Sequence, residues 1–153
     1  MKYTNIETTF REVPDEVSLC INISNCPIHC KDCHSKFLWE DIGDVLTKEN
    51  IEQWLGMKKY SSITCVCFMG GDAEKEYVKT LASFVKSKGY KTCWYSGTII
   101  STDEIFLFGE YFDFIKTGQY IEKFGPLNNK TTNQRFYSIS GKTITDITEK
   151  FWK

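Results

Sequence analysis

The run Ser62–Met69 is apolar on both of its alternating faces, and this pattern constrains the fold more than any other in the chain. A strand buried on both faces is typical of a parallel sheet with helices packed against it. A helix is expected to follow, from Asp72 to a stop at Gly89, because apolar residues recur there at helical spacing, at Tyr77, Val78, Leu81, Phe84 and Val85. The order of strand, glycine turn and helix predicts a βαβ unit.

The same order is repeated along the chain. Further strands are predicted at three runs rich in β-branched and aromatic residues, Ser18–Ser24, Lys91–Tyr95 and Phe112–Lys116. Helices are expected to begin at Thr47 and at Ser101, since both are good N-cap residues. Four strands are too few for a closed eight-stranded barrel, which takes roughly 250 residues. We therefore expect an α/β fold, an open and partial (βα) barrel with a mainly parallel sheet.

The rest of the chain adds no second domain. Tyr120–Lys130 has no clear pattern, Arg135–Ile139 predicts a last strand, and Lys142–Trp152 predicts a terminal element of undefined type. A length of 153 residues suits one domain, and we assign residues 1–153 to it.

Charge and hydropathy exclude several classes of partner. The chain carries 19 basic and 20 acidic residues, a net charge of −1, so no overall field attracts nucleic acid. No window approaches the roughly 20 apolar residues of a membrane span, and Met1–Glu7 lacks the apolar run of a signal peptide. We expect a cytoplasmic protein that binds neither nucleic acid nor membranes.

Three of the seven cysteines stand close together, at Cys26, Cys30 and Cys33, with the spacing C-x-x-x-C-x-x-C. In a cytosolic chain such cysteines indicate metal ligands rather than disulfides. Three soft thiolates leave one coordination position free for a substrate or cofactor. In a 4Fe-4S cluster held this way, the fourth iron is open to a small molecule.

Two other metal groups are compatible with parts of this motif. Cys30–His34 matches the C-x-x-C-H pattern of covalent haem attachment, but haem leaves Cys26 without a role and usually goes with export. Zinc is the stronger alternative, because the three cysteines with either His29 or His34 would complete a tetrahedral site. A zinc site gives no role to two further motifs, Gly70-Gly71-Asp72 and Thr132-Asn133-Gln134-Arg135.

Together, the cysteine triplet, the glycine turn and the segment Thr132–Arg135 resemble the radical S-adenosylmethionine activating enzymes, above all the activases of anaerobic ribonucleoside-triphosphate reductase. The resemblance extends from about Ser18 to Tyr137. It implies a barrel of the radical S-adenosylmethionine type and two cofactors, a 4Fe-4S cluster and S-adenosylmethionine. In that family one electron from the cluster splits S-adenosylmethionine into methionine and a 5′-deoxyadenosyl radical.

The resemblance also implies site residues. Three cysteines would hold the cluster and act in catalysis through it, namely Cys26, Cys30 and Cys33. Contacts to S-adenosylmethionine would come from the end of the cysteine loop and from three strand ends, at Asp32, Cys33, His34, Gly70, Gly71, Asp72, Ser96, Gly97 and Lys116. Ordinary structural roles exist for several of these, since paired glycines permit a tight turn and an aspartate caps a helix. The other cysteines are expected in the core, at Cys20, Cys65, Cys67 and Cys93.

For the partner, the resemblance implies a glycine in a loop of the anaerobic reductase, from which the radical removes a hydrogen atom. A one-electron donor such as flavodoxin would reduce the cluster. Activation of another glycyl radical enzyme, of the formate lyase type, is an alternative, and a small zinc-binding interaction module is a second. The residues that match the reductase activases, and for which contact with the partner is one suggested role, are Asn133, Gln134 and Arg135.

Overall fold

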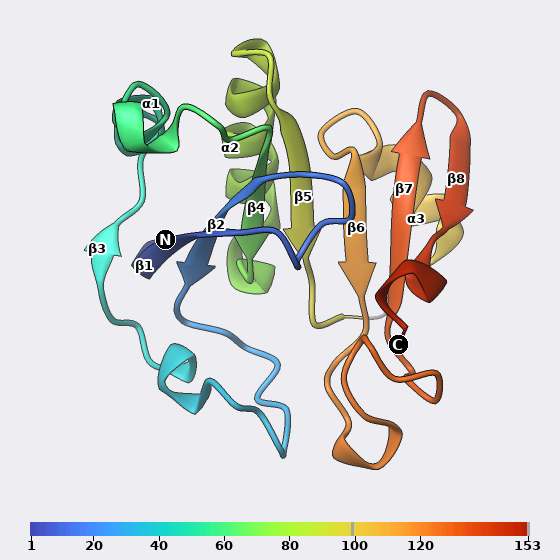
Figure 1. The fold of residues 1–153 in the computed structure, drawn as a ribbon. Coiled ribbons are helices and arrows are strands. Elements are labelled where there is room, and N and C mark those ends of the chain that lie inside the picture. Colours follow the sequence, from blue (N-terminus) through green and yellow to red (C-terminus); the bar gives the residue numbers. More distant parts are fainter. Residues whose placement is uncertain (99, 153) are drawn as a thin grey trace.

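A computed structural model describes residues 1–98 and 100–152. The centre of the molecule is one eight-stranded sheet with the strand order β3-β1-β2-β4-β5-β6-β7-β8 (Figure 1). Its strands are β1 (Lys2–Thr9), β2 (Ser18–Ile23), β3 (Asp44–Val45), β4 (Cys65–Met69), β5 (Lys91–Tyr95), β6 (Phe114–Thr117), β7 (Arg135–Ser140) and β8 (Thr143–Asp146). The helices are α1 (Lys48–Leu55), α2 (Lys75–Ser87) and α3 (Thr102–Phe108), with short 3-10 turns at η1 (Lys36–Trp39), η2 (Lys58–Tyr60), η3 (Asp72–Glu74), η4 (Glu122–Phe124) and η5 (Thr148–Phe151).

Four adjacent strands at the centre of the sheet, β2, β4, β5 and β6, run parallel. Each parallel connection contains one helix, with α1 after β2, α2 after β4 and α3 after β5. The four strands predicted from apolar runs are thereby confirmed, with ends that move by at most three residues. The predicted last strand is confirmed as β7.

The predicted open, partial (βα) barrel with a mainly parallel sheet is wrong. The sheet is mixed, because β1 and β3 on one side and β7 and β8 on the other add four antiparallel pairings to the three parallel ones. The three α-helices have only 8, 13 and 7 residues, so most of the fold is β-structure rather than a helix-covered barrel.

The physical reason for this error lies in the outer strands. Few apolar residues occur in Lys2–Thr9 and Thr143–Asp146, so neither segment has the apolar run that identifies a central strand. β7 follows β6 through a loop that holds only η4, and without a helical crossover the chain returns antiparallel.

The helix boundaries follow local capping. Thr47 forms the predicted cap of α1, and Ser101 forms a capping box with Glu104 at the start of α3. Asp72 behaves differently: the chain passes through η3 before α2 begins at Lys75, and the side chain of Asp72 does not cap that helix. The carboxylate of Asp72 is therefore available for other partners.

The two faces of the central strands have different compositions. One face packs under all three helices; the core between them consists of aliphatic and aromatic side chains, among them Phe68 and Trp94 from the strands and Leu81 and Ile105 from the helices. The opposite face carries the buried thiols of Cys20, Cys65, Cys67 and Cys93, packed with Val13 and Phe136. The prediction that these four cysteines belong to the core is confirmed.

Within the described residues, no helix combines the length and the apolar character needed to cross a membrane.

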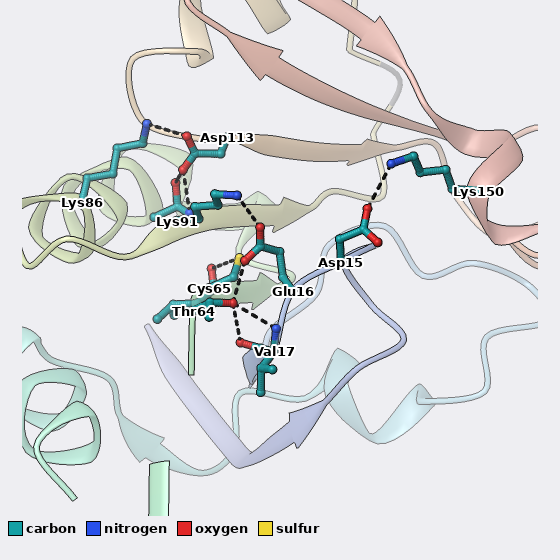
Figure 2. Close-up of polar contacts among 11 residues, drawn as sticks. Asp15, Glu16, Val17, Thr64, Cys65, Lys86, Lys91, Asp113 and Lys150 are labelled. Carbon is teal, nitrogen blue, oxygen red and sulfur yellow. Dashed lines mark hydrogen bonds and ion pairs between the residues drawn. The ribbon is translucent and has the colours of Figure 1, made fainter. Parts of the chain in front are cut away.

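A polar network holds the edge of the sheet at which the parallel strands begin (Figure 2). Glu16 precedes β2, and its carboxylate accepts a hydrogen bond of 2.6 Å from Thr64 Oγ1 and pairs with the ammonium of Lys91. Asp113 precedes β6, accepts from the backbone N–H of Thr92 at 2.9 Å and pairs with Lys86 at 3.2 Å. These carboxylates tie the starts of neighbouring strands together.

We predict that Glu16→Gln lowers the free energy of unfolding by about 1–2 kcal/mol, because a nearly buried charge that bonds two partners is replaced by a neutral amide. Asp15→Asn is the matched control, since its pair with Lys150 is exposed and surface pairs contribute about 0–1 kcal/mol. Urea denaturation of both variants measures the difference. Equal stabilities would show that the Glu16 network does not hold this edge.

Candidate metal centre

The loop that follows β2 carries the cysteine triplet and leaves the sheet at the edge where the parallel strands end (Figure 1). Asn25 and His29 have positive φ angles of 59° and 50°, so the loop turns sharply on both sides of Cys26. The N–H of Cys26 donates to the carbonyl of Leu38 at 2.9 Å, which holds the start of the loop against η1. All three cysteines are free and half-buried.

Two of the three loop sulfur atoms, those of Cys30 and Cys33, have a backbone hydrogen-bond donor beside them. The N–H of Ser35 donates to Cys33 Sγ at 3.3 Å. Burial raises the pKa of the Cys30 thiol; a backbone hydrogen bond from Tyr120 and the charge of Lys116 act in the opposite direction, while Cys33 and Cys26 raise the pKa further. The three thiols therefore lie close enough to influence one another, with a cation beside them.

Zinc and a 4Fe-4S cluster place different demands on the residues of this loop. His29 stacks on Trp39 with ring centroids 4.5 Å apart, and His34 packs against Tyr120 at 5.1 Å, so both imidazoles contact aromatic rings. Among residues 1–98 and 100–152, no three His, Cys, Asp or Glu side chains converge as they do around one metal ion. A zinc site needs donors that converge on one point, whereas a 4Fe-4S cluster spreads its thiolates over different irons. Three free thiols on one loop fit the cluster.

At the end of β4, two glycines in the left-handed region make the predicted turn. Gly70 has φ 109° and Gly71 has φ 89°, and a Cβ on Gly71 would lie 2.5 Å from Val78. The Gly70 carbonyl accepts a hydrogen bond of 2.8 Å from the indole of Trp94 on the next strand. Only glycine satisfies both the backbone angles and the close approach at Gly71.

The side chain of Asp72 connects the ends of β4 and β5. One carboxylate oxygen accepts from Ser96 Oγ at 2.5 Å, and the other accepts from the Gly97 N–H at 3.0 Å. The interpretation of Asp72 as a helix cap is wrong, because both oxygens bond to the following strand end instead. Two of the predicted site segments are thereby joined.

Lys116, at the end of β6, brings the remaining segments together. Its ammonium is buried, and it donates to the carbonyls of Gly118 at 2.6 Å and Ser96 at 3.4 Å. Burial lowers the pKa of Lys116 to about 8, against the opposing effects of Cys30, Asp72 and Cys26. The lysine is thus near the cysteine loop on one side and near the Asp72 carboxylate on the other.

The cysteine loop also packs directly on a strand end. A Cβ on Gly97 would lie 2.8 Å from Ile28, so the glycine leaves the space that the loop fills. Sequence reasoning missed Ile28 and missed Tyr120, which contacts His34 and Cys30. The glycine at position 97 could have predicted close packing and thus the contact with Ile28. Tyr120 lies in a segment that has no clear sequence pattern.

The predicted residues therefore divide into two groups. The structure brings together the strand ends and the loop that faces them, namely Gly70, Gly71, Asp72, Ser96, Gly97 and Lys116 with Cys26 and Cys30. Asp32, Cys33 and His34 stay with the loop: Asp32 and Cys33 are half-buried, and His34 is exposed with its ring against Tyr120.

Comparison with known proteins gives one match. A family model described as a 4Fe-4S single cluster domain matches residues 16–140, a span that contains the cysteine loop, all the strand ends described above and the segment Thr132–Arg135. No curated protein and no solved structure matches the chain.

We predict that Cys26→Ala, Cys30→Ala and Cys33→Ala each lose bound iron after anaerobic reconstitution, because each removes one thiolate of the set. Cys65→Ala is the control, since its thiol is fully buried on the sheet and should leave the iron content unchanged. Iron and sulfide analysis with the visible spectrum measures the outcome. Iron that depends on Cys65 and not on Cys30 would refute the assignment.

Proposed function

The chain belongs to the family of 4Fe-4S single cluster domains, and from that premise we propose that Cys26, Cys30 and Cys33 hold its cluster and that the protein is a radical S-adenosylmethionine enzyme. Its proposed reaction is reductive cleavage of S-adenosylmethionine, by which it installs a glycyl radical on anaerobic ribonucleoside-triphosphate reductase. The resemblance of the cysteine triplet, the glycine turn and Thr132–Arg135 to the reductase activases supports this choice over a formate lyase activase.

The observation that carries the proposal is the meeting of three strand ends beside Cys30. A three-cysteine set leaves one position open to a ligand, and Lys116 and the Asp72 carboxylate near it carry charges of opposite sign. The amino acid part of S-adenosylmethionine is itself a zwitterion, with an ammonium and a carboxylate. A zinc-stabilised module does not require a buried ammonium or a glycine turn at this end of the sheet.

Each strand end has a part in holding that ligand. Lys116 has a pKa of about 8 and is mostly charged at pH 7, so it favours a carboxylate near it. The left-handed turn at Gly70 and Gly71 brings backbone to the end of β4, where the second lone pair of the Gly70 carbonyl, which already accepts from Trp94, can accept from an ammonium. Asp72 orients the Ser96–Gly97 turn, which would contact the ribose. When bound, the cluster supplies the single electron that splits the sulfonium.

The proposed partner is the glycine-bearing loop of the reductase. Phe37 and Phe124 are 54% and 37% exposed in η1 and η4, two segments at the edge that carries the cysteine loop (Figure 1). Exposed aromatic side chains are favoured in the core of protein interfaces. A partner loop that docks there would complete the site, because hydrogen abstraction needs reacting atoms held about 3–3.5 Å apart. A one-electron donor of the flavodoxin class would reduce the cluster.

We predict that Asp72→Asn raises the dissociation constant of S-adenosylmethionine about 10-fold, about 1.4 kcal/mol, because the Ser96–Gly97 turn and the field around Lys116 both depend on the carboxylate. Asp103→Asn, an exposed residue of α3, is the control and should bind as the wild type does. Calorimetric titration of the loaded proteins gives the constants, and thermal unfolding shows the effect on folding. Unchanged affinity with a lowered melting temperature would leave Asp72 a purely structural residue.

The function as a whole is tested by mixing reduced protein, S-adenosylmethionine and the anaerobic reductase under anaerobic conditions. We expect a glycyl radical signal by electron paramagnetic resonance, and no such signal when the glycine of the reductase is replaced by alanine. A signal only with a formate lyase would assign the other activase. Turnover of a small molecule instead, or a colourless protein with stoichiometric zinc, would overturn the proposal.

A further inference from the structure

The segment Thr132–Arg135 is only partly exposed, with Asn133 and Arg135 half-buried. Thr132 and Gln134 are only 3% and 5% exposed. The N–H of Gln134 donates to Thr132 Oγ1 at 3.1 Å, and Arg135 enters β7 opposite Thr117 of β6. The segment is therefore folded against the end of the strand that carries Lys116.

Asn133 reaches from this segment to the turn after β6. Its Nδ2 donates to the carbonyl of Gln119 at 3.0 Å, while its Oδ1 is buried without a hydrogen-bond partner among the described residues. The donor group is the polar link between the segment and the turn. A side chain of the same size without that donor would break this link alone.

The turn itself contacts the metal centre at several points. Gly118 has φ 91°, and its carbonyl accepts from Lys116 Nζ at 2.6 Å. The N–H of Gly118 donates to the carbonyl of Thr98 at 2.7 Å. Tyr120 supplies the backbone hydrogen bond to the Cys30 thiol and packs its ring on His34. A shift of this turn would move both the lysine and a donor to the sulfur.

We infer that Asn133 is a positioning residue of the metal centre, which fixes the Gly118–Tyr120 turn through Gln119 and thereby the hydrogen bond to Cys30 and the position of Lys116. The inference rests on the proposed cluster ligands and assigns to Asn133 an internal role in place of contact with the partner. A hydrogen bond to a ligand sulfur stabilises the more negative, reduced state, so its loss makes the reduction potential more negative. Removal of a residue that hydrogen-bonds to a metal ligand typically changes the metal affinity 10- to 100-fold.

Asn133→Leu tests this role, because leucine is similar in size, is neutral and has no donor. Asn128→Leu is the matched control, an exposed asparagine in the same connection between β6 and β7. Each protein is reconstituted with iron and sulfide, and the midpoint potential is measured by redox titration followed by electron paramagnetic resonance. Loss of iron to a chelator is timed in parallel. Should the leucine variant fail to fold, Asn133→Asp, which also lacks the donor, takes its place and is compared with Asn128→Asp.

We expect Asn133→Leu to move the potential to a more negative value and to speed iron loss about 10-fold, with Asn128→Leu unchanged. An unchanged potential and unchanged iron retention would overturn the inference, most clearly if radical transfer to the reductase were lost at the same time, because the segment would then contact the partner. Failure of the wild-type protein to take up a cluster would instead overturn the proposed function. The two failures are thus distinguishable.

Discussion

The parallel register of β2, β4, β5 and β6 aligns their ends in one row, which consists of Asn22, Met69, Tyr95 and Lys116. Because parallel strands all end at the same edge, every loop that follows them starts from this row. Residues almost 90 positions apart, such as Cys30 and Lys116, meet only for that reason. A slip of one residue in β6 would turn Lys116 to the helix-covered face and would separate it from the cysteine loop.

The end of the sheet that carries Lys116 costs free energy to form. A buried ammonium loses its hydration, and Lys116 recovers only part of it from two carbonyls and from the negative groups nearby. Its lowered pKa expresses the remaining cost. At the opposite end of the same strands, the carboxylates of Glu16 and Asp113 join the strand starts and offset this cost. The end of the sheet proposed to bind the cofactors and the end that stabilises the fold are thus separate.

The central strands were predictable from the sequence because burial on both faces leaves an unbroken apolar run, as in Cys65–Met69. The outer strands were not, because β1 and β8 are polar and gain their place only by pairing with a sheet that already exists. For the same reason the antiparallel pairings of the outer strands were missed, and the sheet was wrongly expected to be mainly parallel. Sequence patterns predict local structure, whereas the pairing of an outer strand depends on tertiary contacts.

The candidate site was predictable to a similar degree. Cysteine spacing and strand-end glycines indicate which segments carry the chemistry, yet the hydrogen bonds of Asp72 depend on β5 lying beside β4. The aspartate that looked like a helix cap bonds instead to a residue 24 positions away. Tyr120 acts on Cys30 through its backbone, which leaves no signature in side-chain types, and the side-chain amide of Asn133 donates to a backbone carbonyl that only the folded turn brings beside it.

The two sets of cysteines show how the fold separates identical side chains by environment. Burial raises the pKa of Cys93 to about 11, and Cys67 is raised for the same reason, so these thiols stay protonated and serve as small apolar groups. Cys26, Cys30 and Cys33 lie on a half-exposed loop, where burial also raises the pKa of Cys30 but the backbone of Tyr120 and the charge of Lys116 oppose that rise. Metal binding requires the thiolate. The iron proposed to bind these three thiols is therefore held at the end of the sheet, even though four of the seven cysteine sulfurs lie within its core.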